Sequence, residues 1–220
     1  MNSAATLEAQ VPDANQSRAE EIANVLSHGI GLVAILGAAP FLMAAASRHG
    51  AFTSILGAAL FVGSAALLYL ASTLYHAAPA ERKGFFRMLD HLAIFFLIAG
   101  TYTPFALGPL KGTFGWTVFA LVWLMAFIGV LFKVLARFRF PYVSTAMYIG
   151  MGWLAVFIVR PLATHVAPAG LLLLVAGGLA YTAGVLFYHW ERLKFAHLIW
   201  HLFVLVGTAC HFVAVLRYAN

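Results

Sequence analysis

Seven long apolar runs constrain this chain more than any other feature of its sequence. The gaps between the runs hold charged residues, glycines and prolines, and none is long enough for a second domain. Each run approaches or exceeds the roughly 20 residues that a helix needs to cross about 30 Å of hydrocarbon. We therefore predict an all-α integral membrane protein, a seven-transmembrane helix bundle. The runs cover approximately residues 25–46, 52–76, 87–108, 113–134, 142–161, 168–188 and 196–217.

The composition supports this class and argues against others. The chain is 63% hydrophobic and only 9% charged, whereas a soluble domain is about a quarter charged. Its net charge of +6 lies in short loops between apolar runs. Basic residues in such loops indicate the orientation of the protein in the membrane and contact anionic lipid headgroups. We therefore expect membrane lipids, and no nucleic acid, as partners. Cys210 is the single cysteine, which excludes an intramolecular disulfide and a thiolate metal cluster.

The N-terminal residues and the loop charges predict the topology. The first 18 residues are polar and lack the basic start and apolar core of a signal peptide. We expect a short disordered cytoplasmic tail over residues 1–17 and one transmembrane domain over residues 18–220. Nine lysines and arginines fall on the side of the N-terminus and four on the other side. We expect a multi-pass protein of the inner (plasma) membrane, and the positive-inside rule predicts a cytoplasmic N-terminus and an external C-terminus.

The entry to the first run carries a stripe of polar residues. Residues 17–20 have the form of a capping box, which predicts a helix beginning near residue 18. Along that helix Glu21, Asn24 and His28 lie at i, i+3 and i+7, on one face. Two interpretations remain open. The stripe is either the wet face of a helix at the membrane interface or a second shell that supports a polar site inside the bundle.

Three further histidines and one aspartate are expected to meet at one depth. His197 and His201 are four residues apart, so they share a helix face and could close on one metal ion. His76 ends the second run, four residues after Ser72, and Asp90 opens the third. Odd-numbered runs begin, and even-numbered runs end, on the cytoplasmic side. The three histidines and Asp90 should therefore lie together near the inner face, where an unpaired carboxylate would be costly.

This set of residues is typical of a zinc site. Three neutral imidazoles with a carboxylate or water form an open tetrahedral arrangement. The absence of thiolates and the few oxygen ligands favour Zn²⁺ over calcium or magnesium, with other first-row metals as alternatives. We expect ordinary structural roles for the remaining histidines, which are His49, His91, His165, His189 and His211.

Four short motifs follow one another along the chain. They are EIANVLSHG at residues 21–29, STLYH at 72–76, DHLAI at 90–94 continuing to GTYTPF at 100–105, and HLIWHLF at 197–203. Together they resemble the haemolysin III family, the bacterial branch of the progestin and adipoQ receptor superfamily. The match covers the first, second, third and seventh runs in order, while the other three add little distinctive pattern.

The resemblance implies a seven-helix bundle with a zinc site near the cytoplasmic face. By this resemblance His76, His197 and His201 bind the zinc. Asp90 is placed to hold a zinc-bound water, with Ser72 beside it. The superfamily is also similar to alkaline ceramidases, which hydrolyse lipid amides. The haemolysin label refers to lysis of host cells.

These observations lead to one main functional hypothesis and two alternatives. The main hypothesis is a ceramidase-like, zinc-dependent hydrolase of a lipid amide or ester. In it Asp90 takes a proton from water and Ser72 donates a hydrogen bond. The first alternative is a non-enzymatic sensor or receptor-like protein of membrane homeostasis in which zinc is structural. The second is a pore-forming cytolysin, although the ionisable residues cluster at one depth and form no line across the membrane.

Overall fold

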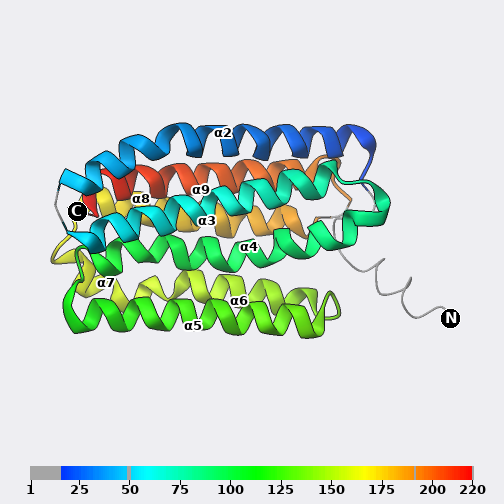
Figure 1. Cartoon of the computed structure of the whole chain (residues 1–220). Helices are drawn as coiled ribbons and strands as arrows, with labels where there is room; N and C mark the ends of the chain where they lie inside the picture. Colours follow the sequence, from blue (N-terminus) through cyan, green and yellow to red (C-terminus); the bar gives the residue numbers. More distant parts are fainter. Residues whose placement is uncertain (1–15, 49–50, 191, 220) are drawn as a thin grey trace.

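The computed structural model describes residues 16–48, 51–190 and 192–219, and these residues form a bundle of long helices that run side by side (Figure 1). Of the tail predicted over residues 1–17, all but the last two residues lie outside the described part of the chain. The helices are α2 (Arg18–Arg48), α3 (Phe52–Ala77), α4 (Ala80–Leu107), α5 (Gly112–Ala136), α6 (Pro141–Trp153), α7 (Ala155–Ala163), α8 (Pro168–Tyr188) and α9 (Ala196–Tyr218).

The seven predicted crossings are confirmed. Seven helical segments are long and apolar enough to span a membrane, and the fifth of them is made of α6 and α7 together. They begin and end within a few residues of the predicted apolar runs, apart from α2 and α4. Those two helices start seven residues before their runs because their polar first turns continue the helix beyond the apolar core. The orientation of the termini stays a prediction.

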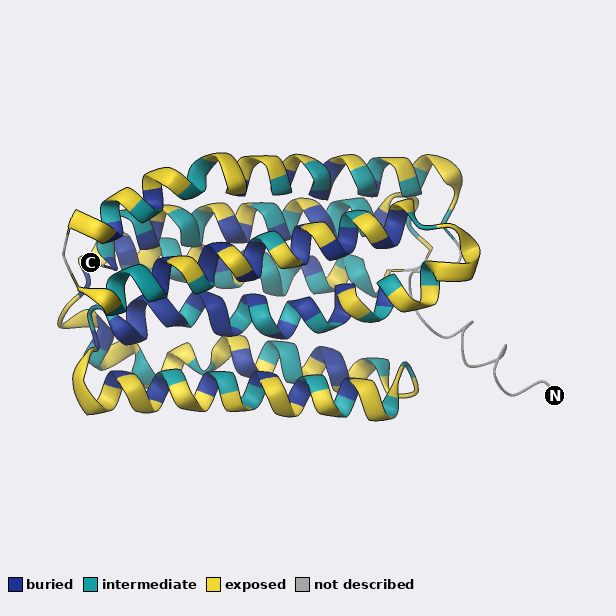
Figure 2. Cartoon of the chain, viewed as in Figure 1, coloured by how far each residue is buried: buried dark blue, intermediate teal, exposed yellow. Residues whose placement is uncertain are grey.

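The helices α3 and α4 form the centre of the bundle. Half of the most apolar part of each is buried, against 17% for the crossing made by α6 and α7. The helix α3 packs against α2 and α4, whereas α5 packs on the far side of α4 and α8 packs against α9. Figure 2 shows the exposed outer faces of α2 and α5. Large apolar side chains such as Phe41 and Phe127 lie on these faces, as expected for contact with lipid.

Small residues let α3 and α4 approach closely. A Cβ atom added to Gly100 would lie 2.0 Å from Ser64 Oγ, so a glycine is required there for this packing. Farther along, a Cβ on Gly57 would lie 2.9 Å from the Cα atom of Pro104. Close approach through small residues is a common way for membrane helices to pack, since lipid provides little hydrophobic drive for association.

The fifth crossing is broken at Leu154, where the sequence predicted one continuous run. Tyr102 of α4 holds the break, because its hydroxyl oxygen accepts a hydrogen bond from the Ala155 N–H at 2.8 Å. The same hydroxyl lies 2.9 Å from the carbonyl oxygen of Met151 and 2.5 Å from that of Gly152, and it can donate to one of them. A side chain of another helix thus satisfies backbone groups that the interrupted helix leaves without partners.

Candidate metal centre

Helix α9 begins at a turn that the first helix holds in place. Phe195 has a left-handed backbone (φ 59°), and its N–H donates a hydrogen bond to Glu20 Oε1 at 2.9 Å. The other carboxylate oxygen, Glu20 Oε2, accepts from the Ser17 N–H at 2.9 Å, and the Glu20 N–H donates to Ser17 Oγ at 3.4 Å. The predicted capping box therefore forms, and its glutamate also fixes the start of the helix that carries His197.

Three histidines converge at this end of the bundle. His76 lies in the last turn of α3, and His197 and His201 lie in the first two turns of α9. One ring nitrogen from each lies within 4.8 Å of the other two. The ring centroids are 4.9 Å apart for His76 and His197, and 4.5 Å apart for His197 and His201. His76 is 121 residues from His197 and 125 residues from His201 in the sequence, and the three side chains meet at this end of the bundle.

Glu21 selects the tautomer of the His76 ring. Its Oε2 atom lies 2.7 Å from His76 Nδ1, and a carboxylate can only accept, so Nδ1 carries the hydrogen. The lone pair of His76 then lies on Nε2, which is buried and has no hydrogen-bond partner among the described residues. Lys83 Nζ lies 2.5 Å from Glu21 Oε1 and keeps this carboxylate charged and oriented.

A similar argument sets the ring of His201. Ser27 Oγ donates its one hydrogen to the carbonyl oxygen of Asn24 at 2.9 Å. Ser27 can therefore only accept from His201 Nδ1, which lies 2.9 Å away. The lone pair of His201 lies on Nε2, where Ser72 Oγ is 3.5 Å away and can donate to it. Both rings thus turn Nε2 into the cluster, as metal-ligating histidines with a fixed second nitrogen do.

The residues present fit a divalent first-row metal. Nitrogens that bind one zinc ion lie about 2.1 Å from it, and one ring nitrogen of each histidine lies within 4.8 Å of the other two. Two of the rings already have their tautomers fixed, and His76 Nε2 is a buried acceptor without a donor among the described residues. Within that part of the chain the cluster consists of the three histidines, and it could hold a metal ion.

The polar stripe of α2 turns into the bundle. Asn24 is completely buried and His28 is only 2% exposed. The His28 ring stacks on the His201 ring, with centroids 3.6 Å apart and planes 10° apart. Asn24 Nδ2 donates to Gln16 Oε1 at 2.5 Å. Together with the partly buried Glu21, these residues form a polar layer beside the histidines.

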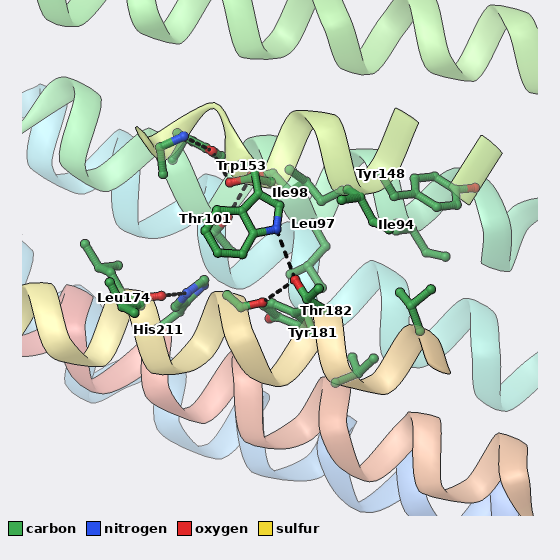
Figure 3. Close-up of a pocket in the computed structure, with 18 of the residues that line it drawn as sticks. Ile94, Leu97, Ile98, Thr101, Tyr148, Trp153, Leu174, Tyr181, Thr182 and His211 are labelled. Atoms are coloured by element: carbon green, nitrogen blue, oxygen red, sulfur yellow. Dashed lines mark hydrogen bonds between the residues drawn. The ribbon is translucent and has the colours of Figure 1, made fainter. Parts of the chain in front are cut away.

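A cavity of about 290 Å³ lies between the helices, and of the three histidines His201 lines it. Figure 3 shows part of its wall. Its wall comes mainly from α4, α6, α7, α8 and α9 and is largely aliphatic. His28, Asp90 and His201 line it near the cluster, and His211 lines it near the opposite end. Trp153 Nε1 donates to Thr182 Oγ1 at 3.2 Å, which links α6 to α8 across the cavity.

Asp90 shares this cavity with His201 but is not a member of the described histidine cluster. Its side chain is mostly buried, and Tyr148 of α6 lines the same cavity. The Tyr148 hydroxyl donates to the carbonyl oxygen of His91 at 2.9 Å. The structure therefore brings Ser72 against His201, and it places Asp90 on the cavity wall.

Sequence reasoning missed two residues that support the site. Ser27 fixes the His201 ring and Lys83 fixes Glu21. The sequence gives only a weak indication of the role of Ser27, which lies three residues after Asn24 and so borders the polar stripe. Lys83 contributed only to the charge count of its loop, and nothing in its local sequence distinguishes it from neighbouring Arg82.

Comparisons with known proteins agree with this architecture. A family model described as "Haemolysin-III related" matches residues 16–212. The "Hemolysin-3 homolog" of Bacillus subtilis (strain 168) is 46% identical over 200 residues, covering 90% of this chain and 94% of the relative. "Hemolysin-3" of Bacillus cereus is 46% identical over 201 residues, covering 90% and 91%. The human "Monocyte to macrophage differentiation factor" is 32% identical over 162 residues, covering 69% and 65%.

Proposed function

Since this chain belongs to the haemolysin III-related family, we propose that it is a membrane-embedded, zinc-dependent hydrolase of a lipid amide or ester. It is a multi-pass membrane protein, and its bacterial relatives imply the plasma membrane. One observation supports the proposal: His201 of the histidine cluster and the carboxylate residue Asp90 line the same largely aliphatic cavity. A metal ligand, an acid–base group and an acyl-binding surface would then share one cavity.

The cavity suits the acyl chain of a lipid. Its volume of about 290 Å³ is near the lower end for small-molecule sites, and mainly aliphatic walls with a few polar groups are typical of such sites. Side chains such as Leu97, Ile158 and Val175 would contact the chain. The polar end, at His201 and Asp90, would then face the carbonyl group of the substrate. A substrate drawn from the membrane also gives a reason for a polar site at this depth.

His76, His197 and His201 would hold the metal. A zinc ion bound there supplies a Lewis acid that polarises a carbonyl group and makes water more acidic. Glu21 would keep the His76 ring in the tautomer that presents Nε2, and Ser27 would do the same for His201. These two contacts pre-orient the ligands before a substrate arrives.

We assign the remaining chemistry to Asp90 and Ser72. Asp90 would act as the general base that takes a proton from the attacking water and returns it to the leaving group. Ser72 would donate a hydrogen bond to the carbonyl oxygen as negative charge develops there. Its hydroxyl already lies 3.5 Å from His201 Nε2, and so at the edge of the cluster.

The test is lipid hydrolysis by the purified full chain in detergent, with N-acylethanolamine and ceramide as probes. We expect Asp90→Asn to lower the rate by about a hundredfold or more, which is typical of a lost general base. Its zinc content should remain that of wild type. His165→Ala, an exposed histidine at the opposite end of the bundle, serves as the control. Undiminished hydrolysis in Asp90→Asn would refute the proposed mechanism.

A structural zinc in a non-enzymatic sensor is the second candidate, and one observation favours it. The histidines come from α3 and α9 and are braced by Glu21 and Ser27 of α2, so a metal would cross-link the bundle. In that case a chelator would unfold the protein, and no lipid would be turned over by the metal-loaded form.

The cytolysin reading draws on the names of the Bacillus relatives. Dye release from liposomes that persists in His76→Ala would support it.

A further inference from the structure

A further histidine lies on the wall of the cavity, deep in the membrane-spanning part of the bundle. His211 of α9 lines the cavity (Figure 3). It follows His201 by ten residues, which is about 15 Å along the helix axis. Polar side chains at such a depth are costly in a bilayer and commonly serve a function. The proposed chemistry gives His211 no role.

The protein fixes both the tautomer and the orientation of the His211 ring. Nε2 lies 3.2 Å from the carbonyl oxygen of Leu174, and a carbonyl oxygen can only accept, so Nε2 carries the hydrogen. A Cβ atom added to Gly177 of α8 would overlap the Cδ2 and Nε2 atoms of the ring, so this edge of the ring faces α8. Nδ1 is the ring atom opposite that edge and therefore points away from α8. The Tyr181 ring packs edge-on against the imidazole, with centroids 5.5 Å apart.

The second nitrogen of this ring is an unpaired acceptor. His211 Nδ1 is buried and has no hydrogen-bond partner among the described residues. Because Nε2 holds the one hydrogen of the neutral imidazole, Nδ1 can be satisfied only by a donor. Leaving a buried acceptor without a donor is unfavourable. A ligand in the cavity that brings a donor to this nitrogen would therefore be favoured.

The hydroxyl groups on the cavity wall are already engaged as donors. Four of them donate to backbone carbonyl oxygens, at 2.5 to 2.9 Å. The fifth, of Tyr181, donates to Thr208 Oγ1 at 2.8 Å, because Thr208 uses its own hydrogen on the carbonyl oxygen of Val204. A ketone in this part of the cavity would find no hydroxyl hydrogen to accept, whereas a hydroxyl group can donate to His211. The five residues are Thr101, Tyr102, Tyr148, Tyr181 and Thr182.

We propose that the cavity selects a lipid whose chain carries a hydroxyl group, and that this hydroxyl donates its hydrogen to His211 Nδ1. The hydroxyl satisfies the unpaired acceptor, while the methylene groups around it contact the aliphatic wall. The inference rests on the proposed function for the part of the substrate that fills the cavity. It adds a substrate class, which is a lipid amide or ester whose acyl chain is hydroxylated far from its carbonyl group.

The test measures the binding of fatty acids, which have no bond for a hydrolase to cleave. The probes are stearic acid, a set of hydroxystearic acids that differ in the position of the hydroxyl group, and the matching keto acids. Each competes with radiolabelled stearic acid for the full chain in a neutral detergent. We expect hydroxyl groups at one position, or at a few neighbouring ones, to tighten binding about tenfold, as a hydrogen bond to a buried unpaired acceptor predicts. The matching keto acids should show no gain, because they have no hydrogen to donate.

Four variants locate the site. His211→Phe keeps a ring without the acceptor and should lose the preference for the hydroxyl group. Gly177→Ala keeps the imidazole but displaces it, and should also reduce the preference. The matched controls are Gly178→Ala, where nothing lies within 4 Å of the added methyl group, and Thr101→Val, which removes another hydroxyl from the same cavity wall. Both controls should keep the preference of wild type.

The design separates binding from other effects. All comparisons use one detergent, so differences in partitioning into micelles cancel between variants. Thermal unfolding identifies any variant that has lost its fold. The comparison of hydroxy and keto acids in wild type requires no variant, and so decides the question even where His211→Phe does not fold.

Two results would overturn the inference. One is equal affinity for the hydroxy, keto and unsubstituted acids in wild type, which is expected if a water molecule is the donor to Nδ1. The other is a hydroxyl preference that persists in His211→Phe or is lost equally in Thr101→Val. A failed hydrolysis assay leaves the binding results in place and refutes the proposed function alone. A missing hydroxyl preference refutes this inference alone.

Discussion

Glu21, in the first turn of α2, accepts a hydrogen bond from the Nδ1 atom of His76, in the last turn of α3, at 2.7 Å. This contact fixes which nitrogen of His76 faces the cluster. Removing the charge of a carboxylate in this position typically weakens metal binding by 10–100-fold. We expect Glu21→Gln to lower zinc affinity by about that factor in titrations against a competing chelator. The control is Glu81→Gln, an exposed carboxylate at the same end of the bundle, whose affinity should equal that of wild type.

The second prediction concerns zinc content. Wild type purified in detergent should hold about one zinc per chain, and His201→Ala should lose it, because two histidines bind zinc far more weakly than three. The measurement is elemental analysis, with thermal unfolding recorded on the same samples. His165→Ala, outside the cluster, should keep its zinc. Wild type that takes up no zinc even after supplementation would contradict the assignment of the cluster.

The third prediction tests the support of His201. In Ser27→Ala the buried Nδ1–H of His201 loses its acceptor, which costs about 1–3 kcal/mol. The free energy of unfolding of the metal-free protein should fall by this amount, as measured by denaturation in mixed micelles. Ser47→Ala is a close control, since Ser47 lies on the same helix and donates to a carbonyl three residues earlier, but is exposed. Equal effects of the two substitutions would contradict the tautomer argument.

The fourth prediction tests the close packing of α3 and α4. In Gly100→Ala the new methyl group would lie 2.0 Å from Ser64 Oγ, so the helices must separate or Ser64 must move. We expect a loss of about 1–3 kcal/mol in the free energy of unfolding. Gly63→Ala makes the same chemical change on α3 where nothing lies within 4 Å. It should be neutral or stabilise the helix by up to about 1 kcal/mol.

The fifth prediction concerns the break between α6 and α7. Tyr102→Phe removes the hydroxyl that accepts from the Ala155 N–H at 2.8 Å, and so leaves backbone groups near Leu154 without a partner. Hydrogen exchange over residues 151–157 should become faster, and stability should fall by about 1–3 kcal/mol. Tyr142→Phe, on an exposed tyrosine of α6, should change neither. Unaltered exchange in Tyr102→Phe would show that the break does not depend on this hydroxyl.

The crossings and the meeting of the histidines could be predicted because both follow from the length and order of the apolar runs along the sequence. Apolar runs of sufficient length locate the spans, and the alternation of spans fixes which ends are neighbours in depth. His76 and His201 are 125 residues apart, yet the count of crossings alone puts them at the same end. The break at Leu154 could not be predicted, because it depends on Tyr102 of another helix and the local sequence has no proline there.

The immediate partners of the histidines, like the break at Leu154, could not be predicted from the sequence. The stripe of Glu21, Asn24 and His28 has the same spacing whether it faces lipid headgroups or the bundle interior, so the sequence left both readings open. The rotation of α2 decides between them, and that rotation is set by packing against α3 and α9. The contact between Ser27 and His201 likewise requires the relative height of two helices to within a few ångströms, which spacing along one chain does not encode.

The separation of 174 residues between Ser27 and His201 has a consequence for biosynthesis. Helices α2 and α3 enter the membrane early, carrying Glu21, Ser27 and His76, but α9 leaves the ribosome last. A nascent chain that stops before residue 197 has one of the three histidines and cannot assemble the cluster. Under the proposed function, metal uptake at this place would follow completed membrane insertion, and a metal-loaded molecule would be one whose last helix has reached its position beside the first.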